Sequence, residues 1–129
     1  LSRRHYNIGD NLDCLLCNQH VEETVEHFFF RCTFSRTCWH LLGIHWPPRG
    51  NRLDMISHLK MRHGRKIIMD IFLVAAWSLW KERNNNYFRH VTPTVASWRT
   101  RFKKDFSDIS HRLPQHKKHL VATVLPAFL

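Results

Sequence analysis

The sequence has little of what a secreted, membrane-spanning or nucleotide-hydrolysing protein needs. Residues 1–20 contain no apolar stretch long enough for a signal peptide. The longest apolar run, Ile67 to Trp77, is interrupted by Asp70 and is too short to span a bilayer. No glycine-rich loop that would cradle a phosphate is present. The four cysteines have a spacing that argues against a disulfide framework. We therefore expect an intracellular protein without a signal peptide, a transmembrane segment or a membrane partner.

Acidic residues are also scarce, because 10 Asp and Glu stand against 20 Lys and Arg and leave a formal net charge of +10. The imbalance is greatest in residues 81–129, which contain ten basic and three acidic residues. A basic excess attracts polyanions, and nucleic acid is the polyanion we expect. The alternative is a soluble basic surface that has no specific partner.

The sequence contains four side chains of the types that bind metals, at a spacing typical of a metal site. Cys14 and Cys17 are separated by two residues, His27 follows after nine more, and Cys32 after a further four. Three thiolates and one imidazole are a common closed shell for structural zinc. A redox pair would explain Cys14 and Cys17, but it would not call for His27 and Cys32 downstream. The sequence therefore predicts one structural Zn²⁺ bound by Cys14, Cys17, His27 and Cys32.

Three other residues are conceivable ligands. Cys38 is an alternative to Cys32, although it falls on the apolar face of a predicted helix and is better explained as a small buried hydrophobe. His20 and His40 are weaker alternatives to His27.

The spacing of apolar residues predicts a mainly α fold. We expect a small Cys₃His zinc-nucleated lobe with a short turn or hairpin, followed by a long buried helix and an amphipathic basic helix. Thr24 is the expected cap of the first helix, in which at most two of Phe28, Phe29 and Phe30 can face the interior. The predicted helices are Thr24–Arg31, Thr33–Leu42 (ended by Gly43), Arg52–Met61, Lys66–Arg89, and a last helix opened by Pro93, capped by Thr92 and stopped by Pro114.

A length of 129 residues suits one structural domain with one modest core. Within it we distinguish a zinc-binding lobe (residues 1–45), a loop with a short helix (46–65), a helical part that packs on the lobe (66–112) and a tail (113–129). Because the chain begins with Leu1 rather than Met, we expect it to be a fragment of a longer reading frame.

Two stretches together resemble a known family. The first is similar to the zinc-binding domain of plant non-LTR (LINE-type) retrotransposon reverse transcriptases, with the Cys-x-x-Cys pair, an acidic patch, a Glu-His-hydrophobic-Phe-x-x-Cys run and a helix that ends in Trp39. The second, Trp77-Ser-Leu-Trp-Lys-Glu-Arg-Asn84 followed by Phe88, resembles the Trp-x-x-Trp-Lys-x-Arg-Asn-x-x-x-Phe stretch that follows this domain in plant copies. Leu15 departs from the proline that the family often has, which changes the stiffness of the turn but not ligation.

The resemblance implies a zinc-binding module on the C-terminal side of a polymerase, with a nucleic-acid role, a neighbouring reverse transcriptase domain as partner, and a nuclear location. The sequence lacks the Tyr-x-Asp-Asp element of a reverse transcriptase. Protein ligands fill all four zinc positions and leave none for water. We therefore expect no catalysis and no small-molecule substrate.

For RNA or DNA, the expected phosphate contacts come from the basic residues of the last two helices, namely Lys81, Arg83, Arg89, Arg99, Arg101, Lys103 and Lys104. Two alternatives stay open: Arg83 is held by an acid or by carbonyl groups, and the last helix simply has a solvated charged face. The corresponding alternative function is a structural or protein-interaction domain that braces the neighbouring reverse transcriptase without touching nucleic acid.

Overall fold

The structure is a computed structural model, and it describes residues 13–17, 19–63, 67–112 and 114–115. Its helices are formed by the segments in which apolar residues recur at helical spacing. Within these ranges the elements are, in order, a short π-helix and four α-helices: η2 (His27–Arg31), α1 (Thr33–Leu41), α2 (Arg52–His63), α3 (Ile67–Arg89) and α4 (Val95–Ser110). In the described residues the extended backbone pairs only at one antiparallel bridge, between Asp13 and Glu22. The mainly α fold with a small hairpin-like lobe is thus confirmed.

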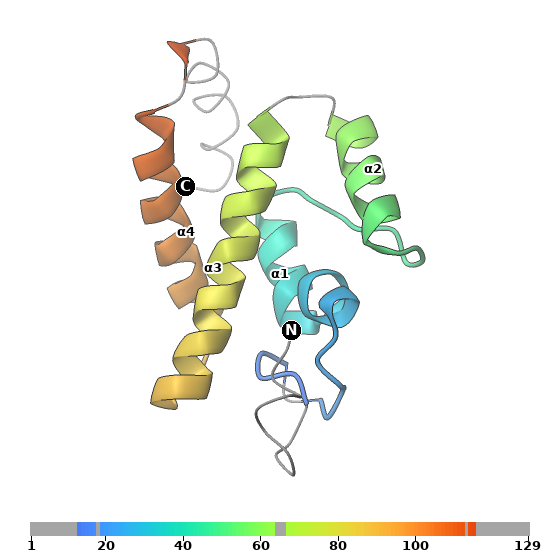
Figure 1. Cartoon of the computed structure of the whole chain (residues 1–129), viewed down its shortest axis with the longest axis vertical. Helices are drawn as coiled ribbons and strands as arrows, with labels where there is room; N and C mark the ends of the chain where they lie inside the picture. The colour runs from blue at the N-terminus through green and yellow to red at the C-terminus, as the bar shows by residue number, and fades with distance from the viewer. Residues whose placement is uncertain (1–12, 18, 64–66, 113, 116–129) are drawn as a thin grey trace.

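Helix α3 lies at the centre of the molecule. Figure 1 shows it between α4 on one side and α1 and α2 on the other. Its first half is buried on most sides, as its nearly continuous apolar sequence predicts. The exceptions are Leu73 and Trp77, whose side chains are exposed although they belong to the same apolar run. No helix in the described ranges combines the length and the hydropathy that a membrane crossing requires.

Two aromatic clusters fill the core. On one side of α3, Phe72 stacks on Trp39 with ring centroids 5.3 Å apart and meets the edge of Trp46 at 5.8 Å. On the other side, Trp98 and Phe102 of α4 stack at 5.5 Å, and both are fully buried. Burying a large apolar side chain contributes roughly 1.5–3 kcal/mol, so these rings fix how α1, α3 and α4 pack.

The ends of the helices follow local chemistry with one correction. Gly43, with φ of 74°, follows α1 and donates its N–H to the carbonyl of His40, as expected for a residue that ends a helix. The cap of α4 is Thr94 rather than Thr92, because the chain stays extended through Thr94 (φ −133°, ψ 150°) and its hydroxyl accepts the N–H of Ser97. The predicted tail lies outside the described residues except for positions 114 and 115.

Candidate metal centre

The first two ligands lie on a tight loop that the backbone closes. The N–H of Cys14 donates to the carbonyl of Val21 at 2.7 Å, next to the bridge between Asp13 and Glu22. His20 takes the left-handed conformation (φ 56°), which lets the chain reverse over so few residues. The loop therefore aims the sulfurs of Cys14 and Cys17 at one point.

Of the other two ligands, His27 is the first residue of the π-helical turn η2 and Cys32 directly follows it. The hydroxyl of Thr24 accepts the N–H of His27 at 3.0 Å, as expected for the cap of the predicted segment Thr24–Arg31, although the residue that directly precedes the π-turn is Glu26. At the other end, the N–H of Cys32 donates to the carbonyl of His27 at 2.6 Å, a bond that spans five residues. In a regular α-helix, residues five apart are rotated by about 140° from each other. The π-turn removes much of that offset and places Cys32 beneath His27.

The same turn sorts the three consecutive phenylalanines. Phe28 and Phe30 are buried and Phe29 is half-buried, which agrees with the expectation that at most two can face the interior. Phe28 makes a T-shaped contact with Trp80 of α3, with ring centroids 5.8 Å apart. The metal-bearing segment is therefore anchored directly on the central helix.

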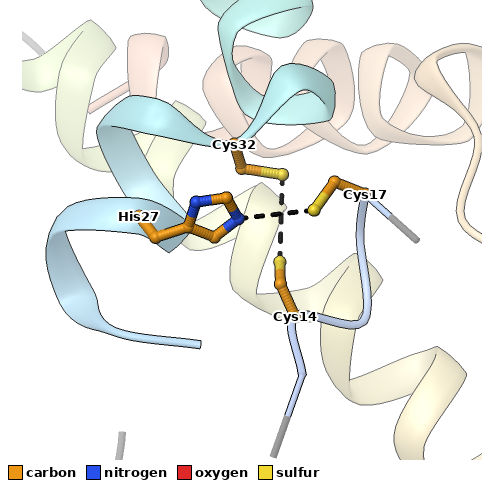
Figure 2. A group of neighbouring side chains, drawn as sticks. All are labelled: Cys14, Cys17, His27 and Cys32. Carbon is orange, nitrogen blue, oxygen red and sulfur yellow. Dashed lines mark hydrogen bonds between the residues drawn. The ribbon is translucent and has the colours of Figure 1, made fainter. Parts of the chain in front are cut away.

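The four donor atoms converge as Figure 2 shows. All of them lie within 4.8 Å of one another, with Cys14 Sγ 3.8 Å from Cys32 Sγ and Cys17 Sγ 3.3 Å from His27 Nε2. Zinc–sulfur bonds of about 2.3 Å in a tetrahedron put two sulfurs roughly 3.8 Å apart and a sulfur and a nitrogen roughly 3.5 Å apart. The donor set and its spacing fit Zn²⁺, so Cys14, Cys17, His27 and Cys32 form a single zinc site.

Hydrogen bonding and burial shift the pKa values of the four ligands. The Cys14 thiol donates to Cys32, and this hydrogen bond, reinforced by burial, raises the pKa of Cys14. The same hydrogen bond lowers the pKa of Cys32. Burial raises the pKa of Cys17 and lowers the pKa of His27, so the imidazole is held in its neutral, metal-binding form. Zinc must displace a thiol proton at Cys14 but not a proton at His27.

The alternative ligands lie elsewhere. Cys38 is fully buried, and it is not part of the group of converging donors. His20 is exposed and contacts Asp13 at 3.2 Å. His40 is exposed on α1, where its ring lies 4.5 Å from that of His45. The set predicted from the spacing is the one that the fold assembles.

The fold and the site together define a small helical zinc protein. A family model described as zinc-binding in reverse transcriptase matches residues 1–39. This segment contains all four ligands and ends at Trp39, the last residue of the first motif. The match supports the zinc-binding domain of reverse transcriptases in this part of the chain, and it stops well before the second motif at Trp77. No curated protein and no solved structure matches the chain.

Among the seven predicted phosphate-binding residues, Lys81, Arg83 and Arg101 form ion pairs with acidic side chains of the chain. Arg83 is buried and its Nε lies 2.9 Å from Oε1 of Glu23. The structure thus shows Arg83 held by an acid, one of the alternatives that the sequence left open. The other two engaged cations are Lys81, paired with Asp105 at 2.7 Å, and Arg101, paired with Glu82 at 2.9 Å.

The remaining cations reach the surface to different degrees. Arg89 and Lys104 are exposed, and Arg99 and Lys103 are half-buried. The sequence did not indicate that Glu23 and Glu82 are buried and pair with arginines, because the partners Arg83 and Arg101 lie far from them along the chain.

Proposed function

We propose that this chain is the non-catalytic zinc-binding module of a retroelement reverse transcriptase and that it holds RNA or DNA beside the polymerase. The single observation that carries the proposal is the closed Cys₃His site within the segment that matches the reverse transcriptase family. Four protein ligands leave zinc no open position for a water nucleophile, so the role of the metal is to stabilise the fold. Zinc ligation ties the loop of Cys14 to the turn of His27 and to the start of α1.

The charge of the chain supports nucleic acid as the partner. The formal net charge is +10, and exposed cations such as Arg89 and Lys104 lie on the two C-terminal helices. A polyanion gains affinity from such a surface by releasing its counterions. The second motif, from Trp77 to Phe88, supports the plant non-LTR lineage, and this lineage favours a nuclear location.

The test is a salt series of single-stranded RNA binding by the zinc-loaded chain, repeated after chelation. Phosphate contacts should give a slope of log affinity against log salt of about −0.7 per contact. Binding should disappear with the zinc, and competition with heparin separates RNA binding from general attraction to polyanions. Absence of binding at low salt by folded, zinc-loaded protein would overturn the proposal.

Matched variants sharpen this test. Lys104→Gln and Arg89→Gln should each weaken RNA binding and make the salt slope shallower by about 0.7. Lys60→Gln changes the net charge equally, but it lies on the exposed side of α2 and should leave the slope unchanged. Equal effects at all three positions would indicate that only the net charge of the chain matters.

A second candidate function is a brace for the neighbouring polymerase domain. Large apolar side chains are exposed on α2, where Leu53 is 70% and Met61 86% exposed. Contiguous apolar patches on a surface mark protein contacts, and Leu53 and Met61 lie about two turns apart on one helix. If α2 docks on the polymerase, Leu53→Lys and Met61→Lys should reduce co-purification with the co-expressed reverse transcriptase domain and leave RNA binding unchanged.

A further inference from the structure

An open groove runs along the exposed face of the second half of α3. Its volume is about 420 Å³, and it is lined by α3 from Trp77 to Arg89 and by Arg101 of α4. The zinc ligands are not among its lining residues, so it is separate from the metal centre. Among the described residues that line it there is no carboxylate; the lining consists of aromatic, cationic and amide side chains.

Aromatic rings mark both ends of the groove. Trp77 is 55% exposed and Phe88 69% exposed. They are eleven residues apart on one helix, or three turns, which is about 16 Å along the axis. Trp80 lies between them and is half-buried, and it makes a T-shaped contact with Phe28 of the zinc-bearing segment. The groove therefore has an exposed aromatic side chain at each end, both of them on α3.

Cations border these rings in fixed positions. Lys81 Nζ lies 5.6 Å from the centre of the Trp77 ring and is held by Asp105. Arg101 is positioned in the same way by Glu82, which is itself buried. Arg89 is exposed at the far end, and within the described part of the chain it makes no ion pair. The ion pairs orient two of the cations, and Arg89 adds a charge that faces solvent.

Two amides complete the lining. Asn84 and Asn85 lie between the aromatic ends. A side-chain amide both donates and accepts hydrogen bonds, as the edges of nucleobases and the hydroxyls of ribose require. Along α3 the lining side chains are thus, in order, two aromatic rings, a cation, two amides, a third aromatic ring and a second cation.

From this arrangement we infer that the groove binds a single-stranded nucleic acid, with unpaired bases stacked on Trp77 and Phe88 and phosphates near Lys81, Arg89 and Arg101. The inference rests on the proposed function and names the form of nucleic acid that the module takes. In a duplex the base faces are covered by their neighbours, so exposed rings favour unpaired strands. An acidic peptide would satisfy the cations but would leave the ring faces without a stacking partner.

The experiment measures the affinity of the zinc-loaded chain for a labelled oligouridylate and for the same strand annealed to oligoadenylate. The single strand should bind more tightly. Trp77→Ala and Phe88→Ala should each weaken its binding by about 5- to 150-fold, the range for loss of one stacked base. Leu53→Ala, which removes an equally exposed apolar side chain from α2, should have no effect.

A spectroscopic readout separates stacking from simple apolar contact. Of the five tryptophans, Trp39 and Trp98 are fully buried, whereas Trp77 is accessible to a base. Oligouridylate should quench the protein fluorescence. Trp77→Phe should keep the affinity, because phenylalanine also stacks, and should lose most of the quenching. Circular dichroism and zinc content of each variant show that it is folded.

The outcomes distinguish the groove from the proposed function. If Trp77→Ala and Phe88→Ala bind as tightly as Leu53→Ala while Lys104→Gln still weakens binding, the groove is not the site and the proposed function stands. Equal affinity for the duplex would overturn the assignment to single strands. If the zinc-loaded wild-type chain binds neither probe, the groove and the proposed function both fail.

Discussion

The ion pair between Glu23 and Arg83 joins the metal-bearing segment to the central helix across 60 residues of sequence. The two side chains are 1% and 5% exposed, and Nε of Arg83 lies 2.9 Å from Oε1 of Glu23. The guanidinium also lies 4.9 Å from the ring centre of Trp80 and 5.0 Å from that of Tyr87. Removing the carboxylate would leave a buried cation without its counter-charge, so Glu23→Gln is the sharpest perturbation of this contact.

The expected loss is large. Breaking a buried ion pair by removing one partner destabilises a protein by about 3–5 kcal/mol. Small domains have a free energy of unfolding of about 5–15 kcal/mol, so Glu23→Gln or Arg83→Met removes roughly a fifth of that value or more. The double variant Glu23→Leu/Arg83→Met should recover most of the loss, because it leaves no unpaired charge.

Urea denaturation of the zinc-loaded chain measures these free energies. A matched control is Lys81→Gln, which breaks the partly exposed pair with Asp105 and should lower stability by about 1 kcal/mol or less. If Glu23→Gln shifts the unfolding midpoint no more than Lys81→Gln does, or if the double variant is less stable than both single variants, the reasoning is wrong.

Three further predictions concern the metal centre and the helix ends. Zinc affinity should rise with pH by about tenfold per unit for each thiol proton displaced. The pKa of Cys14 is raised by its hydrogen bond with Cys32, so the metal-free site holds a proton that zinc must release, and acid therefore weakens binding; competition with a chromophoric chelator across pH measures this. Cys38→Ala should leave the zinc content at one ion per chain by atomic absorption, whereas Cys32→Ser should lower both metal content and helicity. Thr94→Ala removes the acceptor for the N–H of Ser97 and should lower the free energy of unfolding in urea by about 1 kcal/mol.

Each of these predictions has an outcome that contradicts it. A pH-independent zinc affinity would mean that the thiols are already ionised in the metal-free chain. Loss of zinc in Cys38→Ala would place that buried sulfur in the coordination shell. An unchanged unfolding midpoint in Thr94→Ala would show that the start of α4 is held by its packing alone.

Local patterns predicted much of the fold because the physics of helices is local. The predicted segment Thr33–Leu42 corresponds to α1 within one residue, and Arg52–Met61 corresponds to α2 within two. The apolar period and the glycine stop depend on residues within a turn or two of each other. The π-turn at His27 could not be predicted, because α and π hydrogen bonding differ in geometry while the apolar pattern of so short a segment fits both.

The sequence by itself determined the ligand set, because Cys14, Cys17, His27 and Cys32 lie within one short stretch whose spacing suits a single metal ion. Only the tertiary structure decided which cations and rings are accessible. Arg83 is internal because Glu23 meets it across the fold, and Trp77 faces solvent because the neighbouring helices cover other sides of α3. Helical spacing tells which residues share a face, but the partner that covers a face comes from a distant part of the chain.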